Sequence, residues 1–239
     1  MIKKLSVLFL AGILLFAAMA AVSVAQQFDD TIKIGAAVSL TGKVAYEGKL
    51  VKQGYEVWEK WVNEHGGIKA DGKTYGVQII YYDDESDPVR SARLTEKLIT
   101  EDKVHFLGGP YSSAITFATS AIGEKYGIIT IAPEANATNI YERGYKYVFS
   151  VLPPATKIMV PIAYMMEELL QPKPKTVAII VANDLFPLSV AEGFDEICKE
   201  LGFEVVMFEK YPAGSTDLSA LLTKVKTLNP DVLAGGGYT

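Results

Sequence analysis

Apolar runs typical of strands alternate with amphipathic helical patterns along almost the whole chain. We predict seven strands: Ile32–Val38, Val77–Tyr82, Val104–Leu107, Ile128–Ile131, Val177–Val181, Val205–Phe208 and Val232–Ala234. One helix, from about Glu47 to Asn63, carries an apolar stripe of Leu50, Gly54, Val57, Trp58 and Trp61. Because strands that alternate with helices form βαβ units, the pattern predicts an α/β fold with parallel sheets flanked by helices.

Turn and cap residues place several helix ends. Pro88 suits the first turn of a helix that Asp87 caps. Gly202 ends a later helix, and the last helix is expected to begin near Ser215 or Thr216.

The alternation breaks once, and this break predicts two lobes. Residues 137–154 are polar and aromatic and end in Pro153-Pro154, which indicates a loop and crossover. We therefore expect a first lobe at 26–152 and a second lobe at 153–239. The second lobe has only three strand beginnings, so we expect it to be incomplete and the chain to be a fragment of a longer protein.

The first 25 residues are expected to be a secretory signal. Lys3 and Lys4 precede an apolar run, and Ser23-Val24-Ala25 fits a cleavage site. The alternative is an uncleaved membrane anchor, since the run is about long enough to span a bilayer.

The composition of the chain limits the classes of partner that it can bind. The formal charge of −5 becomes −7 without the two signal lysines, which argues against nucleic acid or an anionic membrane as a partner. The lone Cys198 cannot form an internal disulfide and is expected to be buried in a helix stripe.

A turn between a strand and a helix carries the strongest sign of binding chemistry. In the stretch G-G-P-Y-S-S, Ser112 and Ser113 stand where the helix that runs to Tyr126 begins. The unpaired N–H groups of a helix start favour a small anion such as a carboxylate. The alternative is a plain helix cap, but parallel sheets bind ligands at this end of their strands.

Glu134 and Asn136 follow the next strand and are candidates for the polar end of the same ligand, with Glu134 facing an ammonium group. The alternative is ordinary turn polarity around Pro133. Four aromatic residues after predicted strands are candidates for a cleft wall, although each alone fits core packing: Tyr46, Tyr111, Phe186 and Tyr238.

No metal, cofactor or catalytic residue is expected. Asp83, Asp84, Glu85 and Asp87 lack the spacing of a calcium loop and are interpreted as a solvated loop with a helix cap. The sequence contains neither a nucleophile elbow nor a nucleotide-binding glycine motif after a strand.

Five motifs together resemble the periplasmic substrate-binding proteins of branched-chain amino acid ABC transporters, the leucine/isoleucine/valine-binding group. They are I-K-I-G-A-A-V-S-L-T-G from Ile32, N-E-H-G-G-I from Asn63, Y-D-D-E-S-D-P from Tyr82, G-G-P-Y-S-S, and I-A-P-E-A-N-A-T. The resemblance implies a type I periplasmic binding protein fold that closes on an amino acid between its lobes. It also implies a monomer in the periplasm or outside the cell that delivers its ligand to a membrane permease.

The resemblance also implies roles for single residues. Ser112 resembles the serine that binds the ligand carboxylate, while Glu134 and Asn136 fall at the ammonium positions. Phe186 and Tyr238 fall at aromatic positions of the second lobe.

Glu47 falls where an aromatic residue often covers the ligand side chain. Glu47, Glu134 and Asn136 all depart from the family pattern, so we expect a ligand with more positive charge or a different polar tail. The rival interpretations are a ligand-sensing domain of a receptor or regulator with the same fold, and, less favoured, an α/β hydrolase or dehydrogenase or a structural protein.

Overall fold

A six-stranded sheet forms the first lobe. The computed structural model describes residues 28–238, so the expected signal lies outside the described residues. The sheet has the strand order β2-β3-β1-β4-β5-β6. Its strands are β1 (Asp30–Val38), β2 (Ile68–Ala70), β3 (Lys73–Asp83), β4 (Phe106–Gly108), β5 (Thr130–Ala132) and β6 (Val148–Ser150). Neighbouring strands are parallel except β2 and β3, which are antiparallel.

Helices cover both faces of this sheet. They are α2 (Ala45–Glu64), α3 (Pro88–Thr100) and α4 (Ser113–Tyr126). Because side chains alternate along a strand, Ala36 and Val38 pack with α2, whereas Ala37 packs against Leu98 of α3. Because side chains of β1 are buried on both faces of the sheet, the sequence of this strand is almost continuously apolar.

The predicted apolar stripe of α2 does not pack on the sheet. The contacts with the sheet come from Val51, Tyr55 and Val62. Leu50, Val57, Trp58 and Trp61 lie on another side of the helix and are 41% to 69% exposed. The sequence therefore predicted the helix correctly but not the face that is buried.

The α2 side of β4, β5 and β6 is also uncovered among the described residues. Phe106, the first residue of β4, is 38% exposed, and the middle residues of β5 and β6, Ile131 and Phe149, are 40% and 50% exposed.

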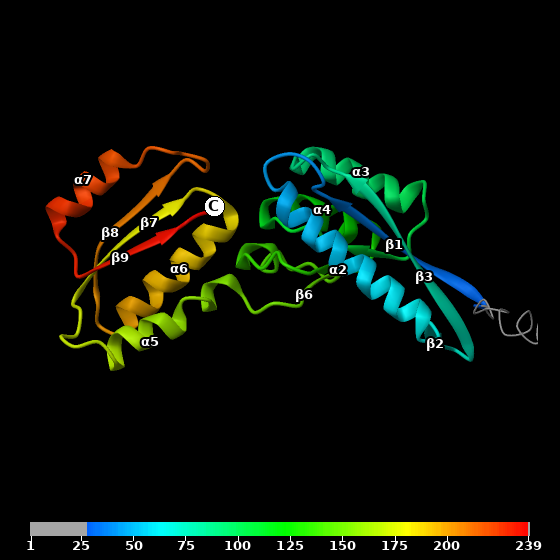
Figure 1. Ribbon diagram of the computed structural model, residues 1–239, viewed down its shortest axis with the longest axis horizontal. Coiled ribbons are helices and arrows are strands. Elements are labelled where there is room, and N and C mark those ends of the chain that lie inside the picture. The colour runs from blue at the N-terminus through cyan, green and yellow to red at the C-terminus, as the bar shows by residue number, and fades with distance from the viewer. Residues whose placement is uncertain (1–27, 239) are drawn as a thin grey trace, which may run out of the picture.

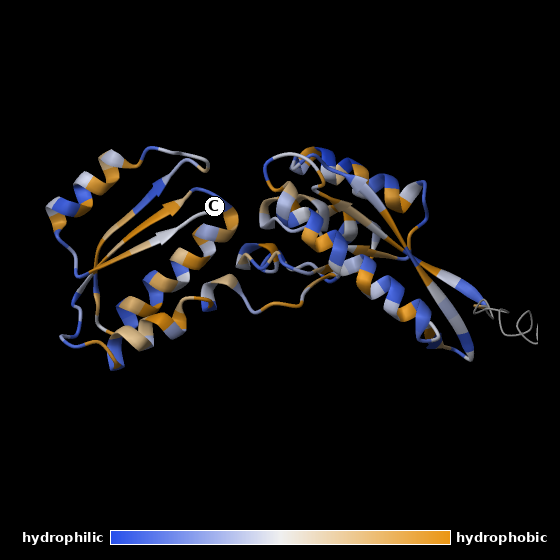
Figure 2. Cartoon of the chain, viewed as in Figure 1, coloured by the Kyte–Doolittle hydropathy of each residue, from blue (hydrophilic) through white to orange (hydrophobic). Residues whose placement is uncertain are grey.

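The second lobe contains a parallel sheet of three strands in the order β8-β7-β9. Its elements are α5 (Val160–Glu168), β7 (Thr176–Ala182), α6 (Leu185–Glu200), β8 (Glu204–Tyr211), α7 (Ser219–Leu228) and β9 (Val232–Gly236). Val177, Ile179 and Val181 of β7 pack with α5 and α6. Ala178 and Ile180 pack on the α7 side, so β7 is the buried centre of the lobe and strongly hydrophobic in Figure 2. As expected, Cys198 is buried in α6.

Within residues 28–238, one extended crossover links the two lobes (Figure 1). Two short 3₁₀ helices, η1 (Thr138–Ile140) and η2 (Ala155–Lys157), flank β6 in this region. The expectation of a loop at 137–154 was wrong for Val148–Ser150, which form β6. Strand β2 was missed although Asp71-Gly72, both with positive φ, is a recognisable hairpin turn before β3.

Two details of the loops differ from expectation. Helix α7 begins at Ser219 and not near Ser215 or Thr216, because Asp217 accepts a hydrogen bond from the Ser219 N–H at 2.9 Å. Asp87 caps α3 as expected by accepting from the Arg90 N–H at 2.6 Å. Asp84, interpreted as part of a solvated loop, is instead completely buried.

Among residues 28–238, no helix combines the length and apolar character needed to cross a bilayer.

Candidate functional site

Each sheet has a topological switch point, where the connections from neighbouring strands leave in opposite directions. In the first sheet the chain moves from β1 to β3 on one side and returns to β4 on the other side. In the second sheet it moves from β7 to β8 and returns to β9. Such switch points, at the carboxyl ends of parallel strands, are where α/β folds bind ligands. Figure 1 shows β7 and β9 pointing toward the first lobe.

The start of α4 lies directly after β4 at the first of these points. Ser112 is the N-cap residue in an extended conformation, yet its side chain makes no capping hydrogen bond. The interpretation of Ser112 as a plain side-chain cap is therefore not what the structure shows. Its hydroxyl has no partner among residues 28–238 and lines a cavity, where it can bind a ligand beside the N–H groups of the helix start.

Ser113 has a structural contact as well. It is 2% exposed, and its Oγ accepts a hydrogen bond from the Ala137 N–H at 3.3 Å. This bond ties the helix start to the loop after β5. The hydroxyl proton of Ser113 is still available to a ligand, because accepting a hydrogen bond does not use it.

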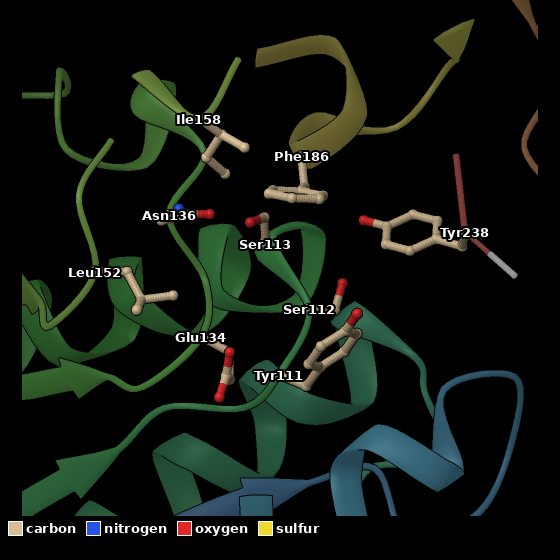
Figure 3. Close-up of a pocket in the computed structure, with 9 residues that line it drawn as sticks. All are labelled: Tyr111, Ser112, Ser113, Glu134, Asn136, Leu152, Ile158, Phe186 and Tyr238. Atoms are coloured by element: carbon tan, nitrogen blue, oxygen red, sulfur yellow. The ribbon is translucent and has the colours of Figure 1, made fainter. Parts of the chain in front are cut away.

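Asn136 presents an unsatisfied acceptor to the cavity. Its Nδ2 donates to the Pro153 carbonyl at 2.8 Å, which fixes the orientation of the amide. The residue is 2% exposed, and its Oδ1 is buried with no hydrogen-bond partner in the structure. Figure 3 shows this oxygen pointing into the cavity. A buried acceptor without a partner is costly, so a ligand donor such as an ammonium N–H would be favoured here.

Aromatic residues of the second lobe form the opposite wall. Phe186, in the first turn of α6, follows β7, and Tyr238 follows β9. Their ring centroids are 6.3 Å apart. Burial raises the pKa of Tyr238, and the charge of Asp184 and the neighbouring Tyr111 raise it further. Tyr238 therefore stays a neutral phenol and can donate a hydrogen bond at physiological pH.

Seven of the eight predicted site residues line this one cavity of about 150 Å³, which Figure 3 shows. They are Tyr111, Ser112, Ser113, Glu134, Asn136, Phe186 and Tyr238. Leu152 and Ile158 also line it and were missed, because they lie in the crossover, where the sequence shows no strand end.

Glu47, the eighth residue, lines an adjoining cavity of about 400 Å³. Tyr111 and Glu134 line both cavities, so the two spaces meet at these side chains. Tyr46, a further candidate for the cleft wall, does not line either cavity and is 73% exposed.

The charged side chains that line the two cavities are all negative. Glu47 and Glu134 are the ionisable acids of the lining, and no lysine, arginine or histidine lines either cavity within residues 28–238. Burial raises the pKa of Tyr111, and the negative charges of Glu47 and Glu134 add to this shift. The lining combines hydroxyls, N–H groups, carboxylates and aromatic rings, a set suited to binding a small polar solute.

Comparison with known proteins identifies the family. A family model described as periplasmic binding protein matches residues 31–239. The chain belongs to this family. Its members are binding proteins, as the names of the relatives below also show.

Curated relatives of this periplasmic binding protein are about 30% identical to it over the aligned residues. A leucine-, isoleucine-, valine-, threonine- and alanine-binding protein of Pseudomonas aeruginosa is 31% identical over 230 residues, which is 94% of this chain and 59% of the relative. A Leu/Ile/Val/Thr-binding protein of Salmonella typhimurium is 32% identical over 218 residues, covering 88% of this chain and 56% of the relative. The chain thus spans little more than half the length of the curated relatives it matches.

Solved structures show the same fold. The substrate-binding protein LivJ of Streptococcus pneumoniae, in complex with isoleucine, has a TM-score of 0.71 and 29% identity over 87% of this chain and 57% of LivJ. A solute-binding protein of Rhodopseudomonas palustris, in complex with p-hydroxybenzoic acid, has a TM-score of 0.73 and 26% identity over 86% of this chain and 54% of that protein.

Proposed function

We propose that this protein is an exported solute receptor that binds a small amino acid-like carboxylate and delivers it to an ABC-type permease. The observation that carries the proposal is the unpartnered Ser112 hydroxyl at the start of α4, at the switch point of the first sheet. The helix start supplies N–H donors and partial positive charge for the carboxylate.

Two of the similar structures support binding of the ligand through its carboxylate. Isoleucine and p-hydroxybenzoic acid, their bound molecules, differ in size and shape, and only isoleucine has an amino group. A carboxylate is the ionised group that both molecules carry. A site that conserves carboxylate binding and varies its other contacts would accommodate both classes.

An aromatic acid is the second candidate ligand, and the acceptors of this site argue against it. The buried Oδ1 of Asn136 needs a hydrogen-bond donor, and Glu134 favours a cation. A benzoate ring supplies neither at that position. An α-amino acid places its ammonium close to its carboxylate, where it can donate to the Asn136 oxygen in the favourable field of Glu134.

The proposed mechanism is binding followed by closure. Residues of the first lobe hold the charged end of the ligand, and Phe186 and Tyr238 of the second lobe close over it. Ligand contacts on both lobes favour a closed population that a permease can recognise. We propose that the protein acts as a monomer in the periplasm or outside the cell.

Calorimetry with leucine, leucinamide and isopentylamine tests this function. We expect leucine to bind at least about tenfold more tightly than leucinamide, because the amide keeps the ammonium but lacks the anion that the helix start attracts. Isopentylamine lacks the carboxyl group altogether and should bind as weakly. Equal affinities for all three compounds, or tighter binding of benzoate, would argue against the proposed ligand.

A further inference from the structure

The space beside the proposed carboxylate site holds two acids without a cationic partner. Glu47 and Glu134 make no salt bridge in the described part of the chain, although seven other ion pairs are formed there. Glu47 comes from the first turn of α2, and Glu134 follows β5. Elements far apart in the sequence thus bring the two carboxylates to the same cavity, beside Tyr111.

The cavity is continuous with the site of the polar head group. Tyr111 and Glu134 line both spaces, so a ligand held at Ser112 can extend past them toward Glu47. Val51 and the aromatic face of Tyr55 provide apolar walls along this path. Tyr55 is held in place because its Oη donates to the Gly109 carbonyl at 2.7 Å.

One ammonium group cannot both satisfy the unpaired oxygen of Asn136 and neutralise the charges of Glu134 and Glu47. Asn136 presents a buried Oδ1 without a partner in the head-group cavity, which one α-ammonium can satisfy. Glu134 and Glu47 then bring two negative charges, and no basic side chain lines either cavity among the residues described. Two acids in a partly closed cleft repel each other and attract a cation.

From these observations we infer that the ligand is a basic α-amino acid, with its head group at Ser112 and Asn136 and its distal cation between Glu134 and Glu47. This inference rests on the proposed function and names the class of amino acid. The methylene chain of such a ligand lies along the apolar wall of the path, and Glu47 determines specificity for the distal charge.

Lysine and norleucine form a matched pair of probes, since they differ only in the terminal ammonium. For the full chain, we expect lysine to bind at least about tenfold more tightly than norleucine at low salt, a ratio that corresponds to about 1.4 kcal/mol. Added salt should reduce this ratio because it screens the distal pair.

Glu47→Gln isolates the distal contact because it keeps the size of the side chain and removes its charge. We expect this variant to lose most of the preference for lysine, so that the ratio of the two affinities falls toward one. Norleucine binding that equals or exceeds lysine binding in the parent protein would overturn the inference and leave the proposed function intact. Failure of every α-amino acid to bind would instead overturn the proposed function and the inference with it.

Discussion

Ser112→Asp is expected to weaken binding of a carboxylate ligand by at least about 100-fold while leaving α4 at least as stable as before. Ser112 is the N-cap of α4, and its hydroxyl makes no capping bond. An aspartate is a strong N-cap and interacts favourably with the helix dipole, so the fold should be preserved or slightly stabilised. The same charge would occupy the place of the ligand carboxylate, and close contact between like charges costs several kcal/mol.

Opposite effects on stability and binding distinguish this explanation from simple damage to the fold. Ser112→Ala is the matched control, and it should lose only about tenfold in affinity because the helix N–H groups remain. Calorimetry gives the affinities, and urea unfolding gives the free energy of unfolding. An aspartate variant that binds as tightly as the parent protein would place the ligand carboxylate elsewhere.

Asp84→Ala is expected to lower the free energy of unfolding by about 3 kcal/mol, since it leaves buried hydrogen-bond donors without a partner. The Asp84 carboxylate accepts from the Ser39 hydroxyl at 2.6 Å, the Ser86 N–H at 2.9 Å and the Ser91 hydroxyl at 2.9 Å. These bonds join the end of β1, the loop after β3 and α3. Asp84→Asn keeps an acceptor and fills the same volume, so it should cost much less.

The pH dependence of the asparagine variant provides a second test. Burial raises the pKa of Asp84, against the opposing effect of its three hydrogen bonds. A raised pKa in the folded state stabilises the fold below the unfolded pKa of about 3.9, and this contribution is lost as the pH rises. The free energy of unfolding of Asp84→Asn should therefore improve relative to the parent protein between about pH 4 and neutrality.

The neighbouring Asp83 is the control, with the opposite sign. Burial alone would raise the pKa of Asp83, but hydrogen bonds from Glu85, Thr41 and Leu40 outweigh it and lower the pKa. Its contribution to stability is present above the unfolded pKa and is lost as the pH falls. If Asp83→Asn and Asp84→Asn showed the same pH trend in urea unfolding, the assignment of the buried network would be wrong.

Local sequence patterns predicted the strands that are buried on both faces of a sheet. β1 and β7 are recognisable because buried faces on both sides require nearly continuous apolar residues. The cap at Asp87 was also predictable, since the polar residue and Pro88 act within one turn. β6 lies within residues 137–154 and α5 follows them, and neither element was predicted from the sequence.

Burial on α2 and at Asp84 could not be predicted from local pattern. The helix has two apolar sides, and Tyr55 and Val62 contact the sheet while Trp58 and Trp61 remain exposed. Asp84 looks like its acidic neighbours in the sequence, and only the approach of Ser39 and Ser91 from other elements explains its burial. Tertiary contacts decide both cases.

The position of a residue directly after a strand has a structural meaning, and it is why most of the candidate residues line one cavity. Parallel strands of one sheet bring their carboxyl ends to one edge, which is why Ser112 and Glu134 line the same cavity, and Phe186 reaches it from the end of β7 in the second sheet. The sequence does not show how the side chains of the site are oriented. That Asn136 presents its oxygen depends on the Pro153 carbonyl of the crossover, a contact across 17 positions of the chain.

The structure of the protein with a bound amino acid would show where the ligand carboxylate lies. We expect a carboxylate oxygen within about 3 Å of the Ser112 hydroxyl and of an N–H group at the start of α4, with the ammonium facing Asn136. A ligand bound instead in the separate cavity lined by Thr138, Ser189 and Glu192, or one whose carboxylate points away from α4, would contradict the account.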